Sequence, residues 1–506
     1  MIRDGRDRRE ETELSARNAC AIAHAMDIQF IVFAGLTALI AALTYIKCRR
    51  APRTELSTVA DANKEVFLAG GGLTWFFVAG SITLTNLSTE QLVGMNGNQM
   101  ALLAWWELAA VAGLIILAKV FLPVYYRYNC TTTTELLEKR YNDHHIRAVI
   151  GTLFLLGNVL IFIPSMLYTG SLFMQSMFNV QAPLILIALA FAAVGSAYAV
   201  FGGLRAVAVS DAYSGVLLLS LGVLVVFLAV KAINFDFSGI PAERLTMIGS
   251  NDSPIPWHTL LTGMILIQIF YWSTNQTITQ RAMASPTLKE GQKGVLVAAA
   301  IRLLIVPPMI VIPGIVSYKL YGDIGDAAYG RIVADVLPTF LSGAFAAAIA
   351  AAVLTSVNSV LNSSTTLYVC DIHEKYVSDQ PNVKRLNAVI SIVIILTGLA
   401  LVPVYATADS IINLIQQLYG LLSMPILSAF IVGLLFNDVD AKAAIAAVVL
   451  GVLLYGFFSF VWNPLHYIHM MFFTLIACVA FAVTISRFVL GTSPSLVFSP
   501  TKRFAG

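Results

Sequence analysis

The chain has 506 residues, of which 58% are hydrophobic and only 12% are charged, and its mean hydropathy is +0.80. Soluble proteins carry about a quarter charged residues, so this composition excludes a soluble protein and indicates a polytopic membrane protein. A net charge of +3 with scattered basic residues argues against a nucleic-acid partner. The five cysteines are far apart and never in C-x-x-C spacing, which indicates neither a disulfide framework nor a metal site.

The first 25 residues are rich in charge and almost free of apolar side chains, so we expect a disordered leader or a misassigned start. Beyond them we look for membrane-spanning helices, which need about 20 mostly apolar residues. Thirteen segments meet this criterion: 28–47, 67–94, 100–127, 148–177, 184–200, 213–233, 257–281, 294–318, 338–369, 386–404, 409–436, 442–461 and 467–486. Their continuous apolar character predicts helices rather than barrel strands.

The basic residues predict an orientation, because Lys and Arg are retained on the cytoplasmic side of a membrane. If the first span starts outside, most of the loop lysines and arginines lie inside, and the outer loops carry only Lys231, Arg244, Lys319 and Arg331. We therefore predict an outer N-terminus and a cytoplasmic C-terminus in the cell membrane. The bilayer is then a partner, and no obligatory protein partner is evident.

The second span contains an unusually polar run, Asn86 to Gln91. Strongly polar residues inside a bilayer are costly and mark functional sites. An unwound helix lining a wet cavity explains the run best, because broken helices hold substrate and ions in secondary transporters. The alternative is a loop between two short helices.

Further polar residues occur in the third, seventh and eighth spans. Glu107 is a lone carboxylate that is either a ligand or a satisfied structural acceptor. Gln268, Tyr271 and Asn275 recur at i, i+3 and i+7, which predicts one helical face. Arg302 either reaches back to the cytoplasmic surface or forms a charge pair in the cavity.

Hydroxyl and amide side chains mark the remaining polar spans. The ninth span is rich in hydroxyls between 352 and 366, which either join packed helices or supply oxygen ligands to a hard cation such as sodium. Asp211 stands at the head of the sixth predicted span and adds a formal charge. The eleventh span contributes Asn413, Gln416 and Gln417.

The two polar, interrupted spans, the second and the seventh, lie five spans apart, which predicts two five-helix repeats over helices 2–6 and 7–11. An odd repeat length inserts the second copy upside down. The fold class is therefore an all-α polytopic membrane protein. Its predicted parts are 1–25, the leader; 26–65, an extra helix and loop; 66–240 and 241–436, the inverted repeats; and 437–506, two scaffold helices and a cytoplasmic tail.

Several segments together resemble the solute:sodium symporter family, and within it the sodium–glucose cotransporter branch. They are FLAG at 67–70, NLSTEQLVGM at 86–95, EKRY at 138–141, YAVFGGLRAV at 198–207, FYWSTNQ at 270–276, QR at 280–281, QKG at 292–294, LNS at 361–363 and DI at 371–372. The resemblance implies a leucine-transporter-type core with one helix before it and two after, and sodium-driven uptake by alternating access.

The resemblance also implies ion ligands. The first sodium site is similar to the carbonyls of Leu84, Leu87 and Ala352 with the hydroxyls of Thr355 and Ser356. Some family members hold a second sodium, and the positions that resemble this site are Asp211, Thr355, Asn358 and Ser359. Asn358 stands where the family has a serine, and an amide oxygen is the ligand that it would offer there.

The positions that bind a hexose in sugar-transporting relatives resemble Gln91, Glu107, Gln268, Arg302 and Gln416. Tyr271 resembles the aromatic residue that stacks on the sugar from the cytoplasmic side, and the outer hydrophobic gate resembles Met95, Trp106 and Ile412. Gln268 replaces an Asn and Arg302 a Lys. At Phe162, relatives that transport sialic acid carry an Arg, so the apolar side chain argues against a carboxylate substrate.

We therefore predict a sodium-coupled symporter that imports a neutral hexose such as glucose or galactose. The alternatives on the same fold are symport of sialic acid, myo-inositol or proline. A membrane enzyme is disfavoured because the sequence has no phosphate-binding loop, HExxH motif or intramembrane histidine cluster. A channel would need a repeated filter motif, which the sequence lacks.

Overall fold

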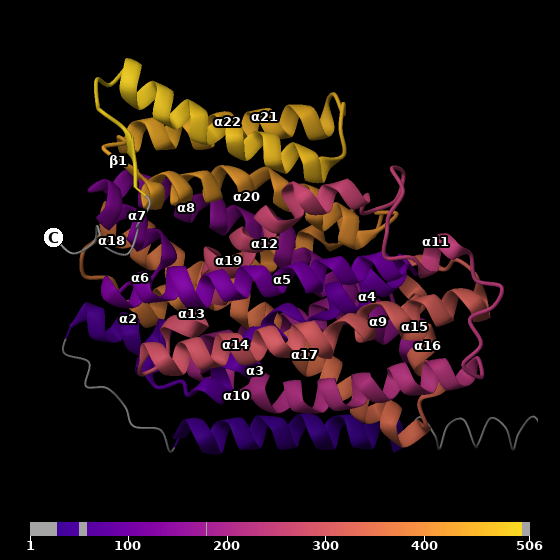
Figure 1. The fold of residues 1–506 in the computed structure, drawn as a ribbon. Coiled ribbons are helices and arrows are strands. Elements are labelled where there is room, and N and C mark those ends of the chain that lie inside the picture. Colours follow the sequence, from indigo (N-terminus) through magenta and orange to yellow (C-terminus); the bar gives the residue numbers. More distant parts are fainter. Residues whose placement is uncertain (1–27, 50–57, 179, 498–506) are drawn as a thin grey trace, which may run out of the picture.

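The computed structural model describes residues 28–49, 58–178 and 180–497. The predicted leader, 1–25, lies outside these ranges. The described chain is almost entirely helical, and its long helices run side by side in one bundle (Figure 1). A pair of two-residue strands, β1 (Phe436–Asn437) and β2 (Ser495–Leu496), joins the segment before α21 to the segment after α22.

The first half of the bundle follows the helix Ile28–Arg49. It comprises α2 (Val59–Phe67), α3 (Trp75–Asn86), α4 (Thr89–Gly97), α5 (Trp105–Ile116), α6 (Leu122–Arg127), α7 (Thr133–Tyr141), α8 (His144–Gly157), α9 (Ile163–Phe178) and α10 (Leu184–Ala232). Short 3₁₀ turns occur at η1 (Ala69–Gly71) and η2 (Ala101–Ala104), and π-helical turns at η3 (Leu117–Phe121) and η4 (Asn158–Phe162).

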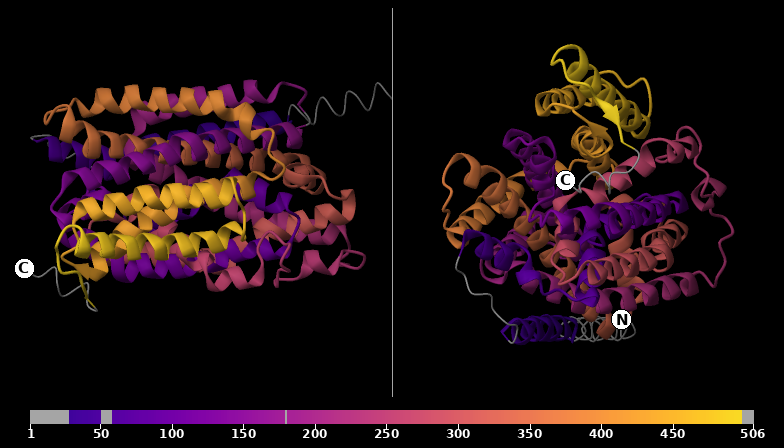
Figure 2. Two further views of the ribbon diagram at one scale, coloured as in Figure 1. Left: turned by 90° about the horizontal axis from the view of Figure 1, so that it is seen from above. Right: turned by 60° about the vertical axis from the view of Figure 1, so that its left-hand side comes forward.

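The second half comprises α11 (Ala242–Leu245), α12 (Gly263–Ser273), α13 (Gln276–Met283), α14 (Leu288–Leu304), α15 (Val306–Tyr321), α16 (Ala328–Val336), α17 (Thr339–Leu367), α18 (Glu374–Tyr376), α19 (Val383–Tyr405) and α20 (Ile411–Leu435). It also has 3₁₀ turns at η5 (Trp257–Leu261) and η6 (Gly325–Ala327) and a π-helical turn at η7 (Tyr368–His373). Two further helices, α21 (Ala441–Phe460) and α22 (Tyr467–Phe488), pack on α20 at one side of the bundle (Figure 2).

Ten continuous helices in the described chain are long and apolar enough to cross a membrane. The other three predicted spans match interrupted or divided helices: 67–94 matches α3–α4, 184–200 the first part of α10, and 257–281 α12–α13. The predicted all-α membrane architecture is confirmed. The helix Ile28–Arg49 lies at the periphery (Figure 2) and is joined to α17 by a hydrogen bond of 2.8 Å from the Gln29 amide to the Ser342 hydroxyl.

The boundary between the fifth and sixth spans differs from the prediction. α10 changes direction at Gly203, where φ is 59° and ψ is −179°, a conformation that only glycine adopts readily. The second part, 203–232, begins ten residues before the predicted start at 213. Asp211 therefore lies inside this helix and is fully buried, rather than at its head, because Gly203 and not the Asp-containing segment provides the turn.

Both predicted interruptions are present. Between α3 and α4, Leu87 has a ψ of 69°, and the Ser88 amide donates to Asn86 at 2.8 Å rather than to the carbonyl of Leu84 four residues back. The second break falls at Thr274 and Asn275, between α12 and α13. Asn275 caps α13 through a 2.9 Å bond from the Thr277 amide. The expectation that Asn275 continues the helical face of Gln268 and Tyr271 was therefore wrong.

The broken helices run in opposite directions. The amide of Leu73, just before α3, donates to the carbonyl of Ala284, just after α13, at 3.0 Å. The beginning of one broken helix thus meets the end of the other, as an inverted repeat requires. Between them α17 is buried along most of its length and packs against α3, α9, α10 and α13.

Candidate functional site

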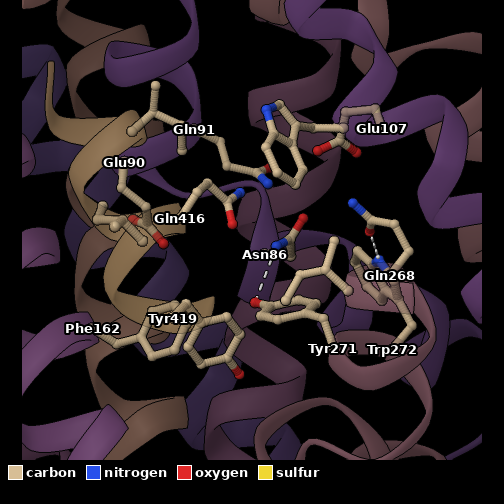
Figure 3. Close-up of a pocket in the computed structure, with 14 residues that line it drawn as sticks. Asn86, Glu90, Gln91, Glu107, Phe162, Gln268, Tyr271, Trp272, Gln416 and Tyr419 are labelled. Carbon is tan, nitrogen blue, oxygen red and sulfur yellow. Dashed lines mark hydrogen bonds between the residues drawn. The ribbon is translucent and has the colours of Figure 1, made fainter. Parts of the chain in front are cut away.

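A cavity lies beside the two helix breaks, between α4, α5, α12 and α20 (Figure 3). Its volume is about 50 Å³, room for only one or two water molecules. A ligand larger than water would therefore need some of these side chains to move. The lining consists of amides, two carboxylates and a large aromatic and aliphatic surface: Asn86, Glu90, Gln91, Trp106, Glu107, Phe162, Ile267, Gln268, Tyr271, Trp272, Ile412, Ile415, Gln416 and Tyr419.

The amides around the cavity are only partly satisfied. Asn86 donates to the Tyr271 hydroxyl at 3.0 Å, and Gln268 accepts from the Trp272 indole at 2.8 Å. The side-chain oxygens of Asn86 and Gln91 are buried without a hydrogen-bond partner. Buried polar atoms are normally paired, so these two acceptors provide places for the hydroxyl groups of a ligand.

Arg302 does not line the cavity, although Glu107 does. The guanidinium lies behind the carboxylate and forms a buried ion pair with it. It also donates to the carbonyl of Thr83 at 3.0 Å and lies 4.4 Å from the ring centre of Trp272. Of the two interpretations of Arg302, the structure shows the charge pair. The described residues that line the cavity thus include two acids and no base.

Of the predicted outer gate, Trp106 and Ile412 line the cavity, and so does Tyr271, the predicted stacking and inner gate residue. Met95 is fully buried in α4 and is not part of the lining. The rings of Phe162, Tyr271 and Tyr419 form an aromatic cluster in the lining, with the ring centres of Phe162 and Tyr419 4.8 Å apart, edge to face. The Tyr419 hydroxyl accepts a 2.5 Å bond from the Asn275 amide, which ties this cluster to the break in α12–α13.

The residues of the predicted first sodium site come together where the α3–α4 break faces α17. Because the Ser88 amide turns away, the Leu84 carbonyl is released from its helical bond, and the Ser356 hydroxyl reaches it at 3.4 Å. Thr355 lies one residue earlier, and its hydroxyl donates to the carbonyl of Ala351 at 2.8 Å and lies 3.2 Å from the carbonyl of Ala352. Leu87 lies in the break itself. This cluster of hydroxyl and carbonyl oxygens is of the kind that a hard cation prefers.

The second predicted ion position combines Asp211 of α10 with Thr355, Asn358 and Ser359 of α17. The hydroxyl of Ser81 donates to Asp211 at 2.6 Å and accepts from the Arg281 guanidinium at 2.9 Å. The Asn358 amide is fully buried with neither its oxygen nor its nitrogen paired. Ser359 is close to Thr85, with 3.3 Å between the hydroxyls. Arg281 was not among the predicted residues, and its charge lies one hydroxyl away from Asp211.

Glu90 and Tyr419 are cavity residues that the sequence analysis did not single out. Glu90 accepts a hydrogen bond from Ser88 and is buried without a basic partner among the described residues. It lies in the polar run that marked the break, so the run itself was the available signal. Tyr419 follows Gln416 by three residues on α20, one helical turn away, and this spacing would have pointed to it.

Solved structures share this architecture. A Na⁺-coupled sialic acid symporter covers 93% of this chain and 99% of its own, with a TM-score of 0.77 and 17% identity. Mhp1, a nucleobase-cation-symport-1 family transporter, covers 83% of this chain and 94% of its own, with a TM-score of 0.54 and 16% identity. The fold is that of leucine-transporter-type secondary transporters, with inverted repeats.

The family follows from the sequence. The model of the sodium:solute symporter family matches residues 66–451, so the chain belongs to that family. The uncharacterized symporter YidK of Escherichia coli (strain K12) is 34% identical over 85% of this chain and 78% of its own. The sodium/glucose cotransporter of Vibrio parahaemolyticus is 29% identical over 89% of this chain and 88% of its own. The sodium/myo-inositol cotransporter 2 of Mus musculus is 28% identical over 78% of this chain and 66% of its own. The chain is thus a multi-pass, sodium-coupled transporter and not an enzyme.

Proposed function

We propose that the protein imports a small neutral polyhydroxyl solute, a hexose such as glucose or galactose, together with sodium. The observation that carries this substrate class is the cavity lining, which offers no base to an anionic solute among the described residues. Glu107 is paired with Arg302 behind it, Glu90 has no basic partner among the described residues, and Phe162 offers nothing to a carboxylate. This disfavours sialic acid, and the unpaired amide oxygens of Asn86 and Gln91 favour a neutral polyhydroxyl ligand.

The unpaired acceptors support the same substrate class. The side-chain oxygens of Asn86 and Gln91 and the carboxylates of Glu90 and Glu107 can all accept from hydroxyl groups. Gln268 and Gln416 add amides on the facing helices α12 and α20. The Tyr271 ring provides an apolar surface for the C–H face of a sugar, in keeping with the mixture of apolar walls and a few polar groups in ligand sites.

Sodium binds, in this proposal, between Leu84, Leu87, Ala352, Thr355 and Ser356. The α3–α4 break joins the two sites, because the residues that flank it, Asn86 and Gln91, line the cavity. A cation that fixes the break would also fix these two amides, so sodium and solute would raise each other's affinity. A second sodium at Asp211, Asn358 and Ser359 is a separate hypothesis, in competition with the charge of Arg281. The membrane orientation, with the N-terminus outside, also belongs to this proposal.

Uptake into proteoliposomes tests the proposal. The full chain would be assayed with labelled glucose, galactose, myo-inositol, sialic acid and proline, with inward sodium gradients and with potassium gradients as control. We expect sodium-dependent accumulation of a neutral sugar. Myo-inositol is the second candidate, because the amide and carboxylate set does not distinguish a cyclitol from a hexose. Accumulation of sialic acid or proline alone would refute the substrate assignment and leave sodium coupling intact.

A further inference from the structure

A groove on the outside of the bundle, remote from the transport cavity, carries three lysines. It lies between the turn η3 and the beginning of α14, and its volume is about 420 Å³. Lys119 from η3 and Lys289 and Lys293 from α14 supply the charge. Gln292, Leu296, Val297 and Ala300 complete the lining.

The two walls of the groove are held together. A π-helical turn leaves a carbonyl without its normal helical donor, and the Gln292 amide donates to the carbonyl of Ala118, within η3, at 2.8 Å. This bond fixes Lys119 on one wall relative to Lys289 and Lys293 on the other. The arrangement of the three lysines is therefore built into the fold and does not depend on a flexible loop.

The charge of the groove is not neutralised within the described chain. None of the three lysines forms an ion pair there, whereas lysines elsewhere on the surface do so: Lys139, Lys319 and Lys375. Lys293 instead lies 4.1 Å above the ring of Trp75. The nearby acid Glu290 is engaged by the Trp75 amide at 2.9 Å.

The groove changes from basic to apolar along the helix axis. Lys289, Lys293, Leu296, Ala300 and Leu303 follow one another at i, i+4, i+7, i+11 and i+14, on one face of α14. Leu296 is 37% and Leu303 48% exposed. On α5, Ile115 is 45% exposed one turn before Lys119. Apolar side chains exposed on a membrane-spanning helix face lipid, so the basic end adjoins the headgroup layer, where Trp75 is also at home.

We propose that this groove binds an anionic phospholipid, with its phosphate group between Lys119, Lys289 and Lys293 and one acyl chain along Leu296 and Leu303. Basic pockets between membrane helices at headgroup depth are suited to such lipids. The lipid would bridge α5 and α14, the two helices that the Glu107–Arg302 ion pair joins deeper in the protein. Its binding would therefore stabilise a wall of the transport site without contacting the cavity.

The test uses the delipidated full chain in a neutral detergent and measures thermal stability during titration with phosphatidylglycerol or with phosphatidylcholine of the same acyl chains. We expect stabilisation by phosphatidylglycerol alone. In the variant Lys119→Gln/Lys289→Gln/Lys293→Gln the half-saturating concentration should rise by about fivefold per lysine removed. The matched control, Lys384→Gln/Arg385→Gln/Lys442→Gln, removes the same charge from other exposed positions and should titrate like the wild type.

Three results would overturn the proposal. Equal weakening in both triple variants would mean diffuse attraction to the whole surface. Equal stabilisation by glycerol phosphate, which lacks acyl chains, would mean a soluble anion site. Equal responses of the wild type to the two lipids would mean no anionic lipid site. If the groove variant does not fold, the three single Lys→Gln variants give the same comparison, and each should shift the titration by about fivefold.

Discussion

The buried ion pair behind the cavity gives the sharpest test of how the site is built. Arg302 is fully buried and Glu107 is 1% exposed, and the two side chains form an ion pair. Removing one partner of such a pair leaves the other charge buried and uncompensated, which costs about 3–5 kcal/mol. We therefore expect Arg302→Gln to lower the free energy of unfolding by about this amount.

Two further variants separate charge from packing. Arg302→Lys retains the charge but loses the planar group that donates to Thr83 and lies over Trp272, so we expect a smaller loss, about 1–2 kcal/mol. The double variant Glu107→Gln/Arg302→Gln leaves no buried charge, and we expect its stability to return to within about 1 kcal/mol of the wild type.

Denaturant titration of the purified variants in mixed micelles, followed by tryptophan fluorescence, measures these differences, and sodium-driven uptake is measured in parallel. The double variant should fold well but transport poorly, because Glu107 lines the cavity. The reasoning fails if Arg302→Gln costs less than about 1 kcal/mol, or if the double variant is less stable than Arg302→Gln, since a buried pair predicts a strong coupling between these two positions.

Three further predictions concern the ion site, the cavity and a buried acid. Ser356→Ala should raise the sodium concentration for half-maximal uptake about tenfold or more. The control Ser171→Ala changes a buried serine that bonds only to its own helix, and it should leave this concentration unchanged. If the two variants show the same dependence of uptake on sodium, the ion site is refuted. Gln91→Ala should weaken sugar binding about tenfold, measured by isothermal titration at saturating sodium, and an unchanged affinity would remove Gln91 from the site. Burial raises the pKa of Asp326 to about 7, so the folded protein binds this proton more tightly than the unfolded chain does. The protein should therefore gain stability as pH falls from about 7 to 4. Asp326→Asn can still accept from the Ile411 amide, and it should flatten the profile of thermal stability against pH across that window.

The sequence predicted most of the architecture because membrane insertion depends on local composition. Segments of about 20 apolar residues must be helical, since no water satisfies the backbone inside a bilayer. The polar runs at 86–91 and around 275 marked the two breaks for the same reason. Local composition did not predict the exact geometry. The turn at Gly203 places Asp211 within a helix, and Asn275 caps α13 and so does not lie on the helical face of Gln268 and Tyr271.

The sequence predicted which residues belong to the site better than it predicted what each residue does there. Sequence patterns marked polar residues in apolar surroundings, but which of them share one cavity depends on contacts between helices that lie far apart in the chain. Only the packing of α5 against α14 shows that Arg302 neutralises Glu107 and does not face the cavity. Glu90, within the polar run 86–91, and Tyr419, one helical turn after Gln416, carried a local signal, but only the packing of α4 and α20 around one cavity shows that both line it.

The sequence by itself determined that this is a helical membrane protein with two interrupted helices and a family motif set, because these properties depend on composition and short-range order. The tertiary structure alone decided which polar groups remain unpaired: the acceptors of Asn86 and Gln91 in the cavity and the three lysines of the surface groove. Whether a polar group has a hydrogen-bond or ion-pair partner depends on which residues of other helices lie next to it. An unpaired buried acceptor and an unneutralised basic groove both have an unfavourable free energy that a ligand can relieve. Such places are therefore available to ligands.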